Sequence, residues 1–310
     1  MYISENEVRA VLSYELLIPA IRQALIDYSA GLVDQPPRTI LRAGNPDAAT
    51  NGWFAVMPVI AGDMMGVKTV TFYPGNAEQN LPTHMAVIEL LRRSTGEPLA
   101  VMDGRLITEM RTAAVSAVAF TALAPLQFES MPVSLGILGS GVQAHAHIEA
   151  LRQVWPALKD VRIWSRTASH AERLAALAGA RSVAIEEAAS ADVVLTVTSS
   201  AEPVLQGRGL RSNALVLAVG ATGATLRELD DDAMRSSYVV AESRSCAERE
   251  SGDVRMSGAK VEAEIGEILA NHGAVAVPRG GRVVFKSVGM AIEDLTAARI
   301  VWQATMERAR

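Results

Sequence analysis

Three cationic side chains stand in parts of the sequence where a solvating charge is unexpected. Arg38 follows two prolines, Lys68 lies within the apolar run 66–72, and Arg111 opens an alanine-rich segment. A guanidinium can hold a carboxylate through two parallel hydrogen bonds, and an ammonium adds a compact charge or a proton. These residues therefore predict a site for an anion, although each could instead form a structural ion pair.

A glycine turn carries the second chemical signal. The short apolar run 133–138 is followed by Gly139-x-Gly141-x-x-Ala144 and then by a segment of helical composition. Gly139 permits a tight turn, Gly141 lets the backbone approach a pyrophosphate, and Ala144 lets the helix pack close to the strand. The free N–H groups and the positive dipole end of that helix then face the phosphates. The spacing predicts a dinucleotide site, with a purely structural turn as the alternative.

The segments around this turn alternate between strand and helix patterns. Further β-like runs lie at 161–164, 192–198 and 214–219, with a helical stretch at 169–178. Such alternation is typical of a doubly wound parallel sheet with helices on both faces.

The end of the second strand bears on the choice of cofactor. An NAD enzyme usually places an acidic residue there for the ribose 2′-hydroxyl, whereas this chain has Ser165, Arg166 and Thr167. Hydroxyl and guanidinium groups suit a 2′-phosphate, so we expect NADP, with NAD as the alternative.

The first third of the chain predicts a different architecture. Residues 4–30 have the pattern of a helix pair, in which Ser4 and Glu7 have the spacing of a capping box and Gly31 ends the second helix. Short apolar runs bounded by turn residues predict antiparallel strands at 38–43, 53–59, 66–72, 85–91 and 98–102.

Two further helices complete the predicted secondary structure. Residues 106–123 form a linking helix that Pro125 closes, and residues 291–310 form an amphipathic helix that packs on the first domain.

Composition limits the class of protein. A length of 310 residues favours two domains, and 49% hydrophobic with 20% charged residues is typical of a globular chain. No window approaches the uninterrupted apolar length of a membrane span, and the N-terminus lacks signal-peptide features. The single cysteine, Cys246, rules out an intrachain disulfide and a thiolate zinc site, and a net charge of −5 argues against nucleic acid. We expect a cytoplasmic protein without metal, membrane or nucleic-acid partners.

Nine motifs, taken in order, resemble those of the ornithine cyclodeaminase/mu-crystallin family. They are Pro37-Arg38, Gly66-Val67-Lys68, Leu81-Pro82-Thr83-His84, Met102-Asp103-Gly104, Arg111-Thr112-Ala113-Ala114, the glycine turn, Ala218-Val219-Gly220-Ala221, Arg227-Glu228-Leu229-Asp230 and the segment 285–294. The resemblance implies an α/β fold in which a Rossmann-type doubly wound parallel sheet, residues 124–290, is inserted into a smaller α+β domain. That smaller domain, residues 1–123 with 291–310, would bind substrate and form a homodimer. Bound NAD or NADP and chemistry at a small α-amino or α-imino acid are also implied.

The resemblance also implies roles for individual residues. Arg38, Lys68 and Arg111 match the family's substrate pocket, Val288 and Gly289 would line the substrate, and Lys68 with Thr222 hold the catalytic positions. The predicted cofactor contacts are Thr83, Arg111, Gly139, Gly141, Val142, Gln143, Ser165, Arg166, Thr167, Thr198, Val219 and Ser287.

Thr222 is a departure from the cyclodeaminase pattern, which has an aspartate at this place as general acid and base. A hydroxyl can orient water but cannot accept a proton near neutral pH. Cyclising ornithine requires oxidation, addition of the distal amine, loss of ammonia and reduction, with several proton transfers, whereas a preformed ketimine needs little beyond positioning and hydride.

The sequence therefore favours an NAD(P)H-dependent ketimine (cyclic imino acid) reductase or amino-acid dehydrogenase. One alternative is an ornithine cyclodeaminase that makes proline and ammonia, in which Glu228 or a bound water would replace the aspartate. The other is a non-catalytic crystallin-like protein that binds NADP or another ligand.

Overall fold

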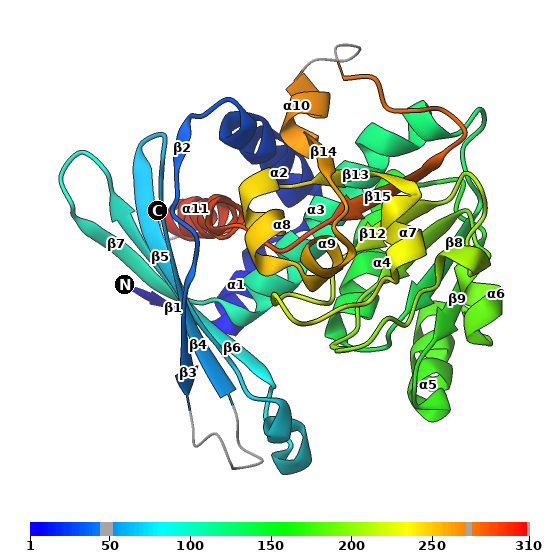
Figure 1. Ribbon diagram of the computed structural model, residues 1–310. Coiled ribbons are helices and arrows are strands. Elements are labelled where there is room, and N and C mark those ends of the chain that lie inside the picture. Colours follow the sequence, from blue (N-terminus) through cyan, green and yellow to red (C-terminus); the bar gives the residue numbers. More distant parts are fainter. Residues whose placement is uncertain (44–51, 271–274, 309–310) are drawn as a thin grey trace. The chain divides into compact units, whose positions relative to one another are not determined.

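The computed structural model describes residues 1–43, 52–270 and 275–308 and divides the chain into two compact units (Figure 1). The first unit comprises Met1–Arg111 with Met290–Arg310, and the second comprises Thr112–Gly289. The division falls inside one long helix, α3 (Arg105–Gln127), whereas the sequence analysis gives residues up to 123 to the first domain.

The first unit begins with the predicted helix pair, α1 (Glu5–Val11) and α2 (Tyr14–Ser29). The predicted capping box is present, because the backbone N–H and the hydroxyl of Ser4 donate to Glu7 Oε2 at 2.8 and 2.6 Å. Gly31, at φ 75°, follows the end of α2 in the left-handed conformation that glycine adopts at little cost. The start of α1 and the end of α2 therefore have local causes in the sequence.

A mostly antiparallel sheet completes the first unit. Its strands are β1 (Tyr2–Ile3), β2 (Val33–Asp34), β3 (Thr39–Ala43), β4 (Gly52–Ala61), β5 (Met64–Phe72), β6 (His84–Arg92) and β7 (Pro98–Asp103). Their order is β1-β7-β6-β5-β4-β2, with β3 also pairing β4, and among the described strands of this sheet the β1–β7 pair alone is parallel. The five predicted strands are present, while the two-residue strands β1 and β2 are too short to leave a pattern. A 3-10 helix, η1 (Pro74–Gln79), joins β5 to β6.

The last helix, α11 (Ala291–Arg308), packs against α2 and across β4, β5 and β6. Gly66 on β5 permits a close approach, since a Cβ there would lie 3.1 Å from Leu295 Cδ1 of α11 and 2.6 Å from the Glu89 carbonyl oxygen. This packing brings the first turn of α11 to the buried face of the sheet.

Helix α3 differs from expectation in two ways. Pro125 lies inside the helix and does not close it, and beyond it the Phe128 amide still donates to the Ala124 carbonyl at 2.9 Å. A proline in the last turn removes one donor without ending the helix. By length and composition α3 is also apolar enough to cross a membrane, contrary to the expectation that no segment is, but most of this window is buried within the protein.

The second unit is built on a parallel sheet of eight strands. They are β8 (Ser134–Leu138), β9 (Asp160–Trp164), β10 (Arg181–Ser182), β11 (Val193–Thr196), β12 (Leu215–Ala218), β13 (Ser237–Ala241), β14 (Val261–Glu264) and β15 (Arg282–Lys286). In the order β10-β9-β8-β11-β12-β15-β13-β14, strands that follow β8 in the chain lie on both of its sides. This reversal at β8 is the switch point at which open α/β sheets bind ligands, and the predicted Rossmann-type fold is confirmed.

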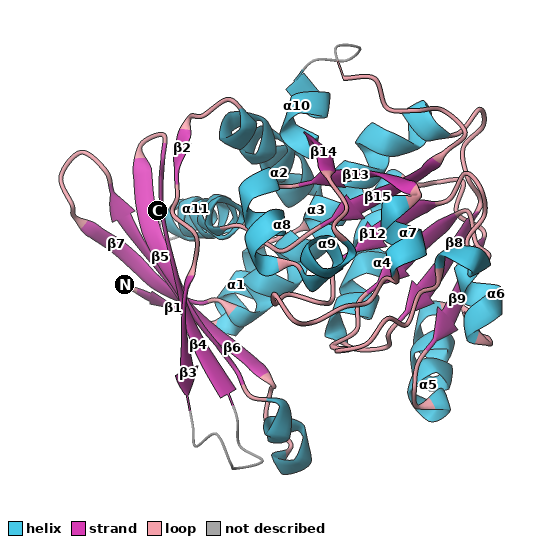
Figure 2. Ribbon diagram, viewed as in Figure 1, coloured by secondary structure: helices cyan, strands magenta, loops and turns pink. Residues whose placement is uncertain are grey.

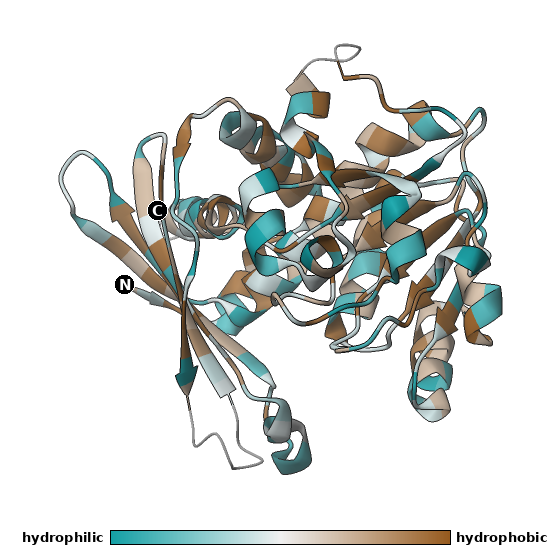
Figure 3. Cartoon of the chain, viewed as in Figure 1, coloured by the Kyte–Doolittle hydropathy of each residue, from teal (hydrophilic) through white to brown (hydrophobic). Residues whose placement is uncertain are grey.

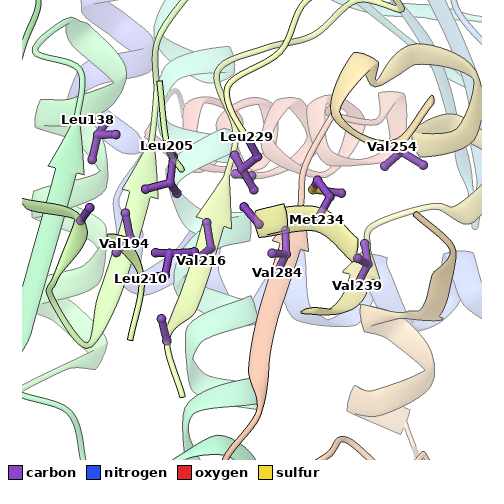
Figure 4. Packing of buried hydrophobic residues seen from close by; sticks show 14 of the residues in the cluster. Leu138, Val194, Leu205, Leu210, Val216, Leu229, Met234, Val239, Val254 and Val284 are labelled. Carbon is purple, nitrogen blue, oxygen red and sulfur yellow. The ribbon is translucent and has the colours of Figure 1, made fainter. Parts of the chain in front are cut away.

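Helices accompany these strands along the chain (Figure 2). They are α4 (Val142–Val154), α5 (Ala168–Ala178), α6 (Ile185–Ala189), α7 (Asp231–Arg235), α8 (Arg244–Glu250), α9 (Gly252–Ser257) and α10 (Ile265–Ala270), with a 3-10 helix, η2 (Gly207–Gly209). Because the sheet is covered, its central strands are continuously apolar, as the brown arrows of Figure 3 show. In the core of Figure 4, Val194, Val216 and Val284 from three strands cluster with Met234 of α7 and Val254 of α9.

Candidate functional site

Lys68 is the most unusual charge of the first unit. It alternates along β5 with residues of the opposite face, so its side chain points to the same side as buried Met64 and Val70, and it is 2% exposed. Its Nζ lies 2.6 Å from Asp294 Oδ2 of α11 and donates to the Thr108 hydroxyl of α3 at 3.5 Å. A buried ammonium is thus held between a carboxylate and a hydroxyl.

Arg111 shares the same carboxylate. Its Nε donates to Asp294 Oδ1 at 3.1 Å and its Nη1 to Glu293 Oε2 at 2.5 Å, and all three side chains are buried. Arg111 follows Thr108 by three residues on α3, so both residues lie on the helix face that meets Lys68. The two acidic residues occupy the first turn of α11, where the helix dipole favours negative charge.

Arg38 joins this cluster from the segment before β3. Gln35, three residues earlier, accepts a hydrogen bond from the Ile292 amide of α11 at 2.9 Å, which fixes the segment to the start of that helix. The positive charge of Arg38 lowers the pKa of Lys68, and so it acts on the same site. The structure therefore brings together the three cations that the sequence analysis groups.

The cluster also contains two carboxylates that the sequence analysis does not assign. Glu293 and Asp294 belong to the quoted motif at 285–294, but nothing in their spacing shows that they meet Arg111, about 180 residues earlier. Lys68 and Arg111 are therefore ion-paired, as the structural alternative predicts. Among these five side chains the cations outnumber the carboxylates by one, and a cationic cluster of this kind suits a substrate carboxylate.

Burial sets the proton affinity of Lys68. Removal from water, reinforced by the charges of Arg111 and Arg38 and opposed by Asp294, lowers the pKa of Lys68 to about 8. Burial beside Lys68 and Arg111 lowers the pKa of His84, at the start of β6, to about 4. Lys68 can therefore exchange a proton near neutral pH while His84 stays neutral.

In the second unit, the glycine turn has the geometry that its spacing predicts. Gly139 has φ 126°, and a Cβ there would lie 2.7 Å from the Val197 carbonyl oxygen. Gly141 is the N-cap of α4 and has open space where a Cβ would lie. Within the described residues, the backbone N–H groups of Val142 and Gln143 find no acceptor, so an open cradle of donors faces outward at the carboxyl end of β8.

The end of β9 lies next to this cradle. The Ser140 hydroxyl donates to Ser165 Oγ at 2.9 Å and so ties the glycine turn to β9, a contact that the sequence analysis missed. Arg166 and Thr167 are exposed, and Arg166 makes no hydrogen bond or ion pair with the described part of the chain. A pocket beside them is lined by residues of the turn and of α4 and α5: Ser140, Gly141, Val142, His145, His170, Arg173, Leu174 and Leu177.

Other predicted cofactor contacts are engaged in hydrogen bonds within the protein. The Thr198 hydroxyl, after β11, donates to Glu228 at 2.8 Å, and the Val219 amide, after β12, donates to the Thr196 carbonyl at 3.0 Å. Thr83 and Arg111 belong to the first unit, where the Thr83 carbonyl accepts from the Tyr73 amide at 2.8 Å.

The segment after β15 is held by one buried carboxylate. Glu242 accepts hydrogen bonds from the Ser287 hydroxyl and from the amides of Val288 and Gly289, the last two at 3.0 and 2.8 Å. The predicted roles of Ser287 toward cofactor and of Val288 and Gly289 toward substrate stay predictions. Their placement by Glu242 could not be anticipated from spacing.

Comparison with known proteins identifies the family. The model of the ornithine cyclodeaminase/mu-crystallin family matches residues 1–309. The chain belongs to this family. Ketimine reductase mu-crystallin of Mus musculus is 42% identical over 313 residues, which cover 98% of this chain and 96% of the relative. The resemblance inferred from the motifs is confirmed.

Solved structures share the fold of this member of the ornithine cyclodeaminase/mu-crystallin family. Thermococcus litoralis Delta(1)-pyrroline-2-carboxylate reductase in complex with NADH and L-proline matches with a TM-score of 0.90 and 28% identity over 100% of this chain and 98% of that one. An archaeal alanine dehydrogenase dimer with bound NAD matches with a TM-score of 0.91 and 27% identity over 100% and 97% of the two chains.

Thr222 is the residue at which the sequence predicts a departure from the cyclodeaminase pattern. It is partly exposed in the segment after β12, and its hydroxyl makes no hydrogen bond among the residues that the structure describes. The position therefore offers a free hydroxyl group and no carboxylate.

Proposed function

We propose that this chain is an NAD(P)H-dependent ketimine reductase, which reduces the C=N bond of a cyclic imino acid to an amine. The observation that carries the proposal is the cluster of Arg38, Lys68 and Arg111, in which Lys68 and Arg111 are buried and three cations act on one site. It matches a small anionic substrate, and relatives whose names state ketimine or pyrroline-2-carboxylate reduction support the chemistry.

The chain's own residues supply binding and a proton. Arg111 and Arg38 hold the substrate carboxylate, and the Lys68 ammonium, with a pKa of about 8, donates a proton to the imine nitrogen or keeps it protonated. The open N–H groups of Val142 and Gln143 fit a pyrophosphate. NADPH held by these groups would supply the hydride, and with the proton from Lys68 it would account for both hydrogens that the C=N bond gains.

The experiment that tests the proposal is a screen of NADPH oxidation. The purified protein is offered pyrroline-2-carboxylate, piperideine-2-carboxylate, 2-oxo acids with ammonia or methylamine, and ornithine. We expect turnover with the cyclic ketimines, and its absence with every substrate would overturn the proposal.

NADPH should be preferred over NADH, because Arg166 is exposed and has no acidic partner in the described part of the chain. Replacing Arg166 by alanine should raise the KM for NADPH about tenfold and leave that for NADH nearly unchanged. Parallel kinetics with both cofactors measure this. Equal efficiency of NADH and NADPH in the unmodified protein would contradict the assignment.

We propose that the protein is a homodimer, because the sheet of the first unit has an exposed apolar face. Met85 and Val87 on β6 alternate with buried residues and are 40% and 45% exposed, and Val101 on β7 and Leu41 on β3 are exposed as well. A second copy would cover this face, as apolar sheet faces require, and an archaeal relative is described as a dimer. We further propose a cytoplasmic location, because the single cysteine of the sequence, Cys246, is buried and has no second cysteine in the chain with which to form a disulfide.

Light scattering of the purified protein should therefore give twice the chain mass of 33.0 kDa. Replacing Val87 by lysine, at an exposed position of β6, should shift the protein toward the mass of one chain. An unmodified protein that stays at 33.0 kDa at micromolar concentration would contradict a dimer.

A further inference from the structure

Glu228, in the second unit, stands out because it is fully buried and collects hydrogen bonds from five donors. Its Oε1 accepts from the amide and hydroxyl of Thr198, at 2.5 and 2.8 Å. Its Oε2 accepts from the Thr196 hydroxyl at 2.8 Å and from the amides of Gly220 and Ala221 at 2.8 and 3.1 Å. One carboxylate thus joins the segments that leave β11 and β12.

A second buried pair holds Glu228 in place. Asp253 of α9 accepts hydrogen bonds from the amides of Glu228 and Leu229, at 2.8 and 2.9 Å. Its other oxygen accepts from Lys286 Nζ at 2.9 Å, and both of these side chains are fully buried. Lys286 also donates to the Ala221 carbonyl at 3.1 Å, so the peptide groups on both sides of Ala221 are fixed by buried charges.

The position of this network relates it to the cofactor. Thr198 and the segment 219–222 follow the carboxyl ends of β11 and β12, next to the switch point at β8. Ligands of open α/β sheets bind outside these strand ends. Gly220 is packed so closely that a Cβ there would lie 2.3 Å from the Thr198 nitrogen and 2.6 Å from Glu228 Oε1. The carboxylate therefore determines how far apart the two loops stand.

This geometry also excludes the role that the cyclodeaminase alternative gives to Glu228. With no exposed surface and five donors on its two oxygens, the carboxyl group has neither access to a substrate nor a free lone pair directed at one. A group in this setting acts through the segments that it holds.

We propose that Glu228, supported by Asp253 and Lys286, is a positioning residue that holds Thr198 and the 220–222 segment in the geometry needed to bind NADPH. The proposal rests on the proposed function only for the identity of the cofactor. Glutamine at 228 would present an NH₂ group to two or three of the five donors and so push the loops apart.

The test measures NADPH binding by the fluorescence of the bound nicotinamide, together with kcat and the two KM values. Glu228→Gln should weaken NADPH binding about tenfold or more and lower kcat, with a smaller change in the KM for the ketimine. Thr196→Val removes one donor from the same carboxylate and serves as a milder variant, with an expected weakening of about threefold.

Asp192→Asn is the matched control. Asp192 accepts from the Val133 and Ser134 amides and from the Ser134 hydroxyl, at 3.0, 3.1 and 2.7 Å, but at the amino ends of β8 and β11. The Asp192→Asn substitution should lower the melting temperature of the protein and leave its affinity for NADPH unchanged. If E228Q and T196V lower the melting temperature but bind NADPH like the unmodified protein, the network is only structural and the proposal is wrong. An unmodified protein that binds NADPH but reduces no ketimine would overturn the proposed function alone.

Discussion

Replacing Lys68 by alanine should lower kcat for ketimine reduction by about a hundredfold or more. A positioned acid is typically worth about 10² to 10⁴ in rate, and Lys68 is the buried ammonium whose pKa, about 8, lies closest to working conditions in this cluster. Initial rates of NADPH oxidation at saturating ketimine, followed at 340 nm, measure the change.

Lys68→Arg is the matched variant, because it keeps the charge but stays protonated throughout the working pH range. Lys68→Arg should bind the substrate carboxylate better than Lys68→Ala. Its pH–rate profile should no longer fall above pH 8. The role of Lys68 as proton donor is refuted if Lys68→Ala raises the KM for the ketimine and leaves kcat intact, because the ammonium then only binds substrate.

Asp294→Asn should move the alkaline limb of the pH profile toward acid by about one unit or more. Burial and the charges of Arg111 and Arg38 lower the pKa of Lys68, whereas the charge of Asp294 raises it. Removing the charge of Asp294 should therefore lower the pKa of Lys68 below its present value of about 8. Activity that needs the ammonium is then present only at lower pH. A series of kcat/KM values from pH 5.5 to 9.5 shows the shift.

Glu293→Gln provides the control for this shift. Glu293 is the adjacent buried carboxylate and forms a salt bridge with Arg111, whereas Asp294 is the carboxylate that raises the pKa of Lys68. Its removal should cost stability and substrate affinity while the alkaline limb stays near pH 8. The account of Lys68 fails if the limb of Asp294→Asn stays in place, or if both variants shift it equally.

The elements of the fold followed from local pattern to a large extent. Strand and helix alternation around the glycine turn predicted the parallel sheet, and the capping box at Ser4 predicted where α1 begins. Such features depend on neighbours within a few residues. The two-residue strands β1 and β2 were not predicted, because they are defined by pairing with distant strands and not by a local pattern. The prediction that Pro125 ends α3 was wrong, because a proline in the last turn of a helix costs only one hydrogen bond.

The site was predicted in part, for a physical reason. Lys68 within an apolar strand and Arg111 at the start of an alanine-rich segment are recognisable in the sequence as unusual charges. Their acidic partners, Glu293 and Asp294, lie on α11, about 180 residues after Arg111 and farther still from Lys68. Nothing local to Asp294 or Glu228 distinguishes it from a solvated acid, since only tertiary packing buries it against its donors. A motif that ends in two consecutive acidic residues at the start of a mostly buried helix was the available signal.

Ketimine reduction is tested most directly by incubating the purified protein with a cyclic ketimine and, separately, with ornithine. Oxidation of NADPH is followed in the first reaction and release of ammonia in the second. With NADPH and piperideine-2-carboxylate or pyrroline-2-carboxylate, we expect rapid cofactor oxidation and formation of the cyclic amino acid. With ornithine and NAD(P)⁺ we expect little ammonia, because Thr222 offers a hydroxyl at the position where the sequence resemblance predicts the carboxylate of a cyclodeaminase, and Glu228 is buried. Rapid release of ammonia from ornithine, with proline accumulating and neither ketimine reduced, would contradict the account and identify a cyclodeaminase.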